Sequence, residues 1–261
     1  MNVRDWLTLM MEVPVADLLE RFRDRDGVVA VVPLTSKNLK DVRKEWGEAA
    51  SAGADMVEWR LDWLEPKRSS KKISLRKVAE VADEMREATG VPVLATYRTA
   101  AEGGAKRRGL VDDEDLDYDR LLRSAAQWAD AVDIEYQRAG ANELIREVRE
   151  EVPVVGSFHL LIPIHSSESF EEWLSEAEAS GANVAKLSAM MDGARSAEAI
   201  REAQMWAVEN LEVPSVVLGM GPGGKQTRLG DAARRSAFTF ATVGRESAPG
   251  QPTLEELRKS L

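Results

Sequence analysis

Eight short runs of apolar, mostly β-branched residues recur along the chain, and charged stretches with helical periodicity separate them. Apolar runs of this length are typical of strands buried on both faces, as in a parallel sheet. Eight strand–helix units in 261 residues predict a closed (β/α)8 TIM barrel. A doubly wound open sheet is the alternative, but it usually needs fewer strands. The runs cover residues 28–34, 56–62, 91–98, 131–136, 152–159, 184–190, 214–220 and 238–244.

Residues 1–27 precede the first predicted strand and form an N-terminal extension to the barrel, which we place at residues 28–261. Leu18, Leu19 and Phe22 give this extension an apolar stripe at helical spacing. We therefore expect a helix here that caps the N-terminal end of the barrel.

The composition disfavours several classes of protein. The chain has no cysteine, which rules out disulfides, thiolate zinc sites and a cysteine nucleophile. Its formal net charge of -10 disfavours binding to nucleic acid or to anionic lipid. No apolar run approaches the roughly 20 residues that span a bilayer, and charged residues interrupt the N-terminal segment where a signal peptide has its apolar core. We expect a cytoplasmic protein with no nucleic-acid and no membrane partner.

Charged side chains interrupt several of the predicted strands. Residues two apart on a strand point the same way. A charged group that faced the apolar layer between strands and helices would lose much hydration free energy. We therefore expect these groups to face the barrel axis near the C-terminal mouth, where barrel enzymes have their active sites. They are Glu58, Arg60 and Asp62 in the second run, Arg98 in the third, Asp133 and Glu135 in the fourth, His159 in the fifth and Lys186 in the sixth.

Lys186 and His159 are the strongest candidates for catalysis. Burial in an apolar strand favours the neutral amine of a lysine, which can attack a ketone to form an imine. His159 lies on the neighbouring predicted strand, and its imidazole can take the proton that an imine makes acidic. Each residue also has a structural interpretation, namely an ion pair of Lys186 with Glu58 or Glu135, and a hydrogen-bonded histidine.

A glycine-rich segment at residues 219–226 nearly satisfies the pattern of a phosphate-binding loop. Gln226 stands where such a loop needs Ser or Thr to contact magnesium, so ATP or GTP binding is disfavoured. We expect instead that this loop lets Arg228 reach a substrate carboxylate with its two-pronged guanidinium. The second histidine, His165, falls in a predicted loop and is expected to be solvated.

Seven short segments at the ends of predicted strands form an ordered set. They are residues 54–62 (ADMVEWRLD), 97–104 (YRTAAEGG), 132–135 (VDIE), 157–159 (SFH), 181–186 (GANVAK), 227–230 (TRLG) and 247–251 (SAPGQ). In this order they resemble the type I 3-dehydroquinate dehydratases of the shikimate pathway. The resemblance implies dehydration of 3-dehydroquinate to 3-dehydroshikimate, with no cofactor and no metal.

The resemblance also implies a role for each matching residue. Lys186 would form an imine with the C3 ketone, and His159 would take a C2 proton and then protonate the leaving C1 hydroxyl. Glu102 would orient the histidine, and Arg228 would bind the substrate carboxylate. The remaining substrate-binding matches are Glu58, Arg60 and Arg98, which would hold ring hydroxyls and balance charge, and Ser247 and Gln251, in a loop that would close over the substrate.

Two features depart from this family, and two other functions stay open. Leu160 follows His159 where the family commonly has an acidic or amide residue, and residues 1–27 have no counterpart. A class I aldolase also uses a lysine imine in a barrel, and residues 221–224 would offer it a phosphate site. The other alternative is a binding protein, namely a catalytically silent barrel that binds an acidic metabolite or a partner. The sequence leaves the oligomeric state open, with a homodimer as one option.

Overall fold

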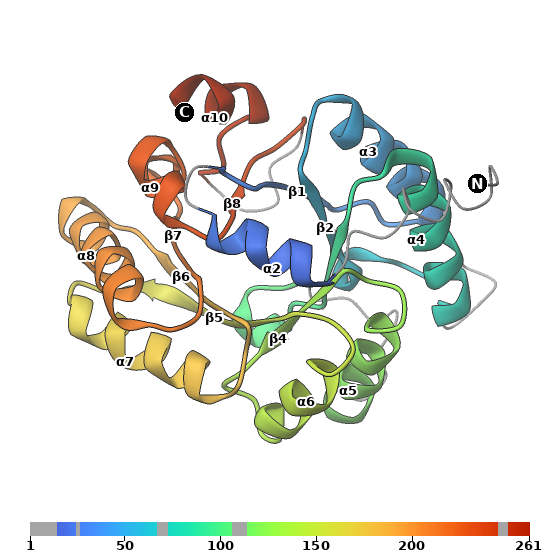
Figure 1. Ribbon diagram of the computed structural model, residues 1–261, viewed down its shortest axis with the longest axis horizontal. Helices are drawn as coiled ribbons and strands as arrows, with labels where there is room; N and C mark the ends of the chain where they lie inside the picture. The colour runs from blue at the N-terminus through green and yellow to red at the C-terminus, as the bar shows by residue number, and fades with distance from the viewer. Residues whose placement is uncertain (1–14, 25–26, 67–72, 106–113, 245–249) are drawn as a thin grey trace, which may run out of the picture.

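The computed structural model describes residues 15–24, 27–66, 73–105, 114–244 and 250–261, which form the predicted α/β barrel (Figure 1). The strands are β1 (Ala30–Leu34), β2 (Met56–Arg60), β3 (Val93–Thr96), β4 (Ala131–Glu135), β5 (Val154–Pro163), β6 (Val184–Met190), β7 (Ser215–Met220) and β8 (Thr239–Phe240). The α-helices are α2 (Val15–Arg23), α3 (Leu39–Ser51), α4 (Leu75–Thr89), α5 (Glu114–Ala125), α6 (Ala141–Val148), α7 (Ser167–Ala179), α8 (Ala194–Asn210), α9 (Gly230–Arg235) and α10 (Leu254–Ser260). Short 3-10 helices are η1 (Leu61–Trp63), η2 (Ala100–Glu102) and η3 (Gly224–Thr227).

The strands form one parallel sheet in the order β7-β6-β5-β4-β3-β2-β1-β8. β1 pairs with both β2 and β8, which brings the last strand back to the first. The two edge strands of this order are β7 and β8. The Ala237 N–H donates to the Ser215 carbonyl at 2.8 Å, so β7 and the residue that leads into β8 lie side by side. The sheet is thus a nearly closed barrel with helices around it, which excludes the doubly wound arrangement (Figure 1).

The second predicted strand is shorter than expected, and Asp62 lies beyond it in η1. The carboxylate of Asp62 accepts two hydrogen bonds of 2.8 Å from the guanidinium of Arg60. It also accepts the backbone N–H of Ala105 at 3.0 Å. The expectation that Asp62 continues the strand face is therefore wrong, because the chain turns into a helical turn after Arg60.

Other strand ends also differ from the expected ones. β3 ends at Thr96, so Arg98 lies two residues past the strand. β8 contains only Thr239 and Phe240, because the chain leaves the sheet and forms a bridge between Thr242 and Thr253. β5 instead runs past His159 to Pro163, since its extension keeps pairing with β6 after a shift in register.

Two apolar layers follow from the alternation of side chains along the strands. Outward residues such as Val57 and Trp59 pack under the helices in the larger buried cluster. Inward residues such as Met56 and Leu94 belong to a separate cluster that fills the lower part of the barrel. The barrel is therefore packed at its N-terminal end, and the polar inward residues lie above this packing, at the C-terminal mouth.

Local sequence signals explain where several helices begin and end. The side chain of Asn38 accepts the N–H groups of Lys40 and Asp41 at the start of α3. Thr253 and Glu256 form a capping box at the start of α10. Among the helices in the described ranges, none has the length and apolar character needed to cross a membrane.

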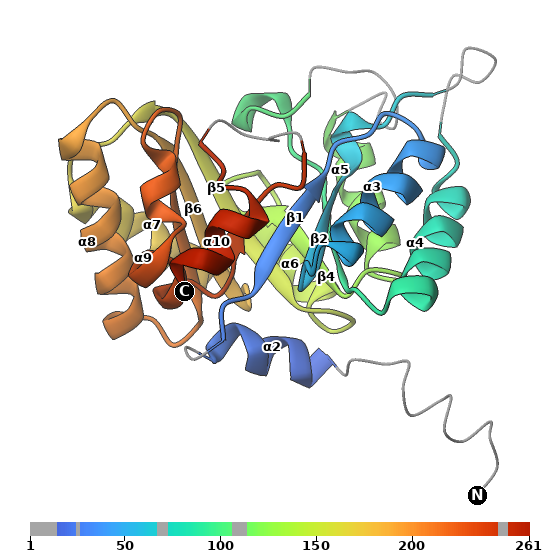
Figure 2. The same ribbon diagram turned by 90° about the horizontal axis from the view of Figure 1, so that it is seen from above.

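Helix α2 lies across the N-terminal end of the barrel (Figure 2). Its Leu18 and Phe22 side chains are only 1% and 3% exposed, and both belong to the cluster that fills the barrel interior. Burial of two large apolar side chains contributes about 1.5–3 kcal/mol each. We infer from this packing that the described part of the extension serves as a cap on the barrel.

Candidate active site

Most of the charged residues predicted for the C-terminal mouth line one cavity of about 200 Å³, whereas Asp62, Asp133 and Glu135 do not line it. Lys186 and His159 both line it, so they lie on the same side of the barrel wall. All predicted site residues line this cavity except Ser247, which lies outside the described residues. The lining comprises Glu58, Arg60, Arg98, Glu102, Gly103, His159, Leu161, Lys186, Ser188, Met190, Leu218, Met220, Arg228, Phe240 and Gln251.

The amine of Lys186 is held from several directions. Lys186 is 2% exposed, and its Nζ donates to Asp133 Oδ2 at 2.8 Å. Glu58 Oε1 lies 3.9 Å from the same nitrogen, and the ring centroid of Phe240 lies 4.9 Å from it. Of the two ion-pair partners expected from the sequence, Glu58 is therefore correct and Glu135 is wrong. The closest carboxylate is Asp133, on the strand between β3 and β5.

Arg98 connects the carboxylates of the site. Its guanidinium donates to Asp133 at 2.7 Å, to Ser157 at 3.0 Å, to Glu135 at 3.1 Å and to Glu102 at 3.2 Å. Burial alone would raise the pKa of Asp133, but the nearby charges of Arg98 and Lys186 outweigh burial and lower that pKa to about 2. Asp133 is therefore a carboxylate at neutral pH, and Arg98 compensates the cluster of negative charge.

His159, in β5, is fixed by Glu102, which lies in the 3-10 helix η2. Glu102 Oε2 lies 2.9 Å from His159 Nδ1 and accepts the His159 backbone N–H at 3.0 Å. Burial, together with the positive charges of Arg98 and Lys186, lowers the pKa of His159 well below its ordinary value. The imidazole is thus neutral at pH 7, and Nε2 is the ring nitrogen that remains for a ligand.

Glu102 itself has a strongly altered acidity. Burial raises the pKa of Glu102 to about 8; Arg98 opposes this rise, and the carboxylates of Glu135 and Asp133 add to it. An unfolded chain has a glutamate pKa of about 4.3. Between about pH 4.3 and about pH 8, Glu102 is therefore protonated in the folded protein and ionised in the unfolded chain.

We expect Glu102→Gln to change how stability depends on pH. The contribution of Glu102 to stability is present below about pH 4.3 and is lost as the pH rises toward its folded pKa of about 8. The amide does not titrate, so the variant's Tm minus that of the wild type should increase from about pH 5 to about pH 8. Thermal unfolding of both proteins between about pH 5 and about pH 8 measures this difference in Tm. Glu150→Gln, at an exposed position, is the control, and a pH-independent difference for Glu102→Gln would contradict the assignment.

Arg228 is held by the glycine-rich loop after β7. Its guanidinium donates to the carbonyl of Gly219 and, at 2.8 Å, to that of Gly224. A Cβ on Gly224 would lie 2.5 Å from the Gly219 carbonyl oxygen and 3.1 Å from the Arg228 guanidinium. Glycine is therefore required at residue 224 for this approach, and the loop fixes Arg228, which is 2% exposed, at the cavity wall.

Gln251 reaches the cavity from the segment that precedes α10. Gly250 before it has a φ of +84°, and a Cβ there would lie 2.5 Å from the Gly221 carbonyl oxygen. The backbone of residue 250 thus packs directly on the glycine-rich loop. This packing places Gln251, which is 4% exposed, on the same cavity as Arg228.

Some residues of the site were not predicted from the sequence. The sequence places Asp133 on the correct face but does not indicate its pairing with Lys186, and Ser157 lies in one of the matching segments without a predicted contact. The inward alternation along β6, at Ser188 and Met190 after Lys186, was the signal that could have found part of the lining. The remaining unpredicted lining residues are Gly103, Leu161, Leu218, Met220 and Phe240.

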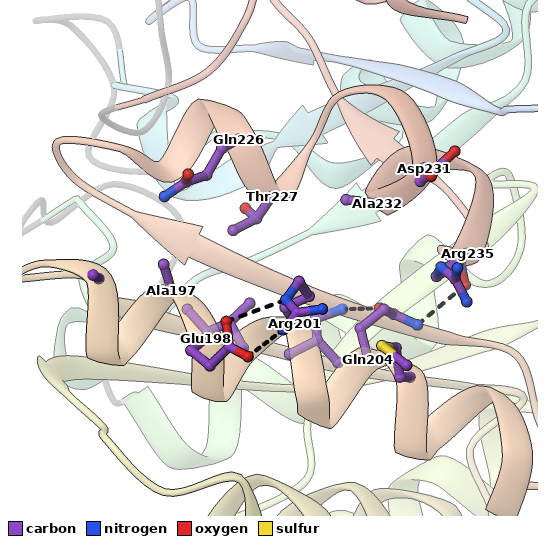
Figure 3. Close-up of a pocket in the computed structure, with 13 residues that line it drawn as sticks. Ala197, Glu198, Arg201, Gln204, Gln226, Thr227, Asp231, Ala232 and Arg235 are labelled. Carbon is purple, nitrogen blue, oxygen red and sulfur yellow. Dashed lines mark hydrogen bonds and ion pairs between the residues drawn. The ribbon is translucent and has the colours of Figure 1, made fainter.

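A larger cavity, of about 640 Å³, lies outside the barrel wall between α8 and the segment η3–α9 (Figure 3). Several of its polar side chains already have partners. Arg201 pairs with Glu198, and the Gln204 amide donates to Ser215 at 2.9 Å and to the Arg235 carbonyl at 3.1 Å. None of the predicted site residues that the structure describes lines it, so the candidate chemistry belongs to the barrel mouth.

His165 also lies away from the cavity. Its side chain is 45% exposed, and Nε2 lies 2.9 Å from Asp192 Oδ1, between the loop after β5 and the loop after β6. It is thus solvated as expected, with a hydrogen-bond partner that the sequence does not indicate.

Comparisons with known proteins agree with this geometry. The sequence profile of the family described as Type I 3-dehydroquinase matches residues 30–261. A 3-dehydroquinate dehydratase of Methanothermobacter thermautotrophicus is 31% identical over 230 residues, which cover 88% of this chain and 94% of that protein. The crystal structure of 3-dehydroquinate dehydratase from Geobacillus kaustophilus has a TM-score of 0.81 at 26% identity and 90% coverage of both chains.

A type I 3-dehydroquinate dehydratase from Clostridium difficile, solved with covalently modified comenic acid, has a TM-score of 0.77 at 28% identity. The match covers 89% of this chain and 90% of that one. Similarity of this extent favours the dehydratase over the aldolase alternative. Because the family profile spans the whole barrel from β1 to the C-terminal residue, the chain belongs to the type I 3-dehydroquinase family.

Proposed function

We propose that this protein dehydrates 3-dehydroquinate to 3-dehydroshikimate in the shikimate pathway of aromatic amino-acid biosynthesis, with Lys186 as nucleophile and His159 as proton carrier. The protein is a hydro-lyase of the type I family. The observation that carries the assignment of roles is the single cavity lined by the Lys186 amine and by the His159–Glu102 pair.

The first step is imine formation at Lys186. Its amine attacks the C3 ketone of the substrate, and the carbonyl oxygen leaves as water, so a C=N bond replaces the C=O bond. The amine must be neutral for the attack. Asp133 Oδ2 lies 2.8 Å from Nζ and orients the amine through this hydrogen bond. The imine then withdraws electrons from C2.

The second step is elimination, with His159 moving the proton. A neutral imidazole takes the C2 proton, a C1–C2 double bond forms, and the C1 hydroxyl departs as water after it receives a proton from the imidazolium. Water then hydrolyses the imine with the help of His159 and restores the Lys186 amine. The water consumed here balances the water released in imine formation, so the net reaction loses one water.

Glu102 and the arginines support these steps. Glu102 holds Nδ1 of His159, which fixes the ring orientation and leaves Nε2 for the substrate. Arg228, whose position the glycine-rich loop fixes, binds the substrate carboxylate together with Gln251. Glu58, Arg60 and Arg98 hold ring hydroxyls and balance charge, and the family resemblance assigns Ser247 to the segment over the substrate.

The proposal also covers the partners, the cellular location and the assembly of the protein. The net charge of -10 supports a protein without a nucleic-acid partner. A chain without cysteine suits the reducing cytoplasm, where we place the protein. We propose a homodimer as its assembly, as for many barrels, and sedimentation velocity would measure its mass.

A substrate comparison tests the function. We expect turnover of 3-dehydroquinate, followed as formation of the conjugated product, and no turnover of sugar phosphates. The reason is that Arg228, one of the arginines in the cavity wall, suits a carboxylate held in a two-pronged hydrogen bond. Turnover of sugar phosphates alone would contradict the proposal and favour the aldolase. Binding of 3-dehydroquinate without any product would favour the silent barrel.

A further inference from the structure

We propose that the N-terminal cap positions Lys186 through a line of three phenylalanine rings. The ring centroids of Phe22 in α2 and Phe238 lie 5.3 Å apart, and those of Phe238 and Phe240 lie 5.6 Å apart. The Phe240 centroid then lies 4.9 Å from Lys186 Nζ. This inference rests on the role of Lys186 proposed above, and it gives the cap a part in catalysis.

Each contact in the line has a favourable geometry. The Phe22 and Phe238 rings are tilted by 51°, and the Phe238 and Phe240 rings meet edge to face at 84°. Aromatic pairs prefer such arrangements, and their rings keep few rotamers when buried. Exposed fractions of 3%, 0% and 5% for Phe22, Phe238 and Phe240 leave little room for movement. A change at Phe22 therefore reaches Phe240 through direct contacts.

The strand that carries Phe240 depends on this packing. β8 has two residues and a ladder with β1 alone, through Ala30–Thr239 and Val31–Phe240. On its other side, the hydrogen bond from Ala237 to the Ser215 carbonyl crosses the seam before the strand begins. Because a two-residue strand has few backbone hydrogen bonds to fix it, side-chain packing inside the barrel sets where Phe240 lies.

Phe240 in turn limits where the amine can lie. Asp133 and Glu58 attract Nζ from the strands β4 and β2, and the face of Phe240 approaches it from β8. A ring at this distance also attracts the ammonium group through a cation–π interaction. The ring therefore fixes the starting position from which the amine attacks the substrate ketone, and the cap fixes the ring.

The cap lies outside the part of the chain that matches the family. The family profile begins at residue 30, whereas α2 ends at Arg23. The catalytic residues alone would not require a helix here. The line of rings from Phe22 to Lys186 connects this extension to the site, whereas Leu18, which is buried in the same cluster, has no ring to contribute to the line.

Phe22→Leu in the full chain tests the proposal, because it keeps an apolar side chain and removes the ring. The readouts are the single-turnover rate of adduct formation, trapped with borohydride in the presence of 3-dehydroquinate, and the separate values of kcat and KM. We expect adduct formation and kcat to fall about three- to tenfold, because small displacements of a reacting group are costly. KM should stay within about twofold of the wild type, since Arg228 and Gln251 are not part of the line.

Leu18→Ala is the matched control, because it removes buried apolar surface from the same helix and leaves all three rings of the line in place. We expect it to lower Tm at least as much as Phe22→Leu and to leave the adduct rate unchanged. Phe238→Leu, in the middle of the line, should reproduce the effect of Phe22→Leu and serves in its place if that variant is unstable. A wild-type adduct rate in both ring variants, or an equal loss in Leu18→Ala, would overturn the proposal. Absence of any adduct in the wild type would instead contradict the function itself.

Discussion

Lys186→Ala should abolish both turnover and the borohydride-trapped adduct. Among the lysines that the structure describes, Lys186 is the one that lines the cavity, and the variant lacks its amine. Loss of a covalent nucleophile commonly reduces kcat by about 10⁶-fold, so we expect activity below detection. Mass spectrometry after borohydride reduction with 3-dehydroquinate should find the added mass on Lys186 in the wild type and no added mass in the variant.

The fold of Lys186→Ala should survive, because Asp133 keeps other partners. The Arg98 guanidinium and the Ser157 hydroxyl still donate to its Oδ1, at 2.7 Å and 2.6 Å. Circular dichroism and Tm verify this. Lys225→Ala is the matched control, since Lys225 pairs with Glu256 at the surface. An adduct that formed on another lysine, or turnover in Lys186→Ala within about tenfold of the wild type, would refute the assignment.

His159→Ala should separate imine formation from elimination. The adduct with Lys186 should still form and accumulate, whereas turnover should fall by about 10²–10⁴-fold, the usual contribution of a positioned acid–base group. The reason is that the proposed role of His159 is proton transfer, whereas the amine of Lys186 is held by Asp133 and Glu58. Mass spectrometry of the reduced adduct, alongside steady-state rates, measures both quantities on one sample.

The other histidine provides the control for this experiment. His165→Ala removes an exposed imidazole that pairs with Asp192 and lies outside the cavity lining, so its turnover should equal that of the wild type. Near-native turnover in His159→Ala would show that another group carries the proton. Failure to form the adduct in His159→Ala would mean that the histidine acts earlier, in imine formation.

The fold was largely predictable because the barrel strands are buried on both faces. A strand of this kind appears in the sequence as a continuous apolar run, and β6 was predicted to the residue at 184–190. The ends of β3 and β8 were overestimated, since the apolar residues that follow these strands are buried in loops at the barrel mouth. Burial of Phe238 and Ala241 on either side of β8 illustrates why apolar character alone does not define a strand end.

The site was predictable to a different extent at each residue. Period-two alternation placed Glu58 and Lys186 inside the barrel, because it depends only on the strand itself. The pairing of Lys186 with Asp133, instead of Glu135, depends on the stagger between β4 and β6, which no local pattern encodes. Glu102 came from the family resemblance alone, since a residue in a 3-10 turn such as η2 has no periodicity to reveal where its side chain points.

The apolar plug formed by Leu18, Phe22 and the lower inward residues has a consequence for the order of events at the site. It seals one end of the barrel, so substrate, product and the water of both imine steps share the opening at the other end. Because the barrel has this one opening to the site, we expect product release to precede binding of the next substrate.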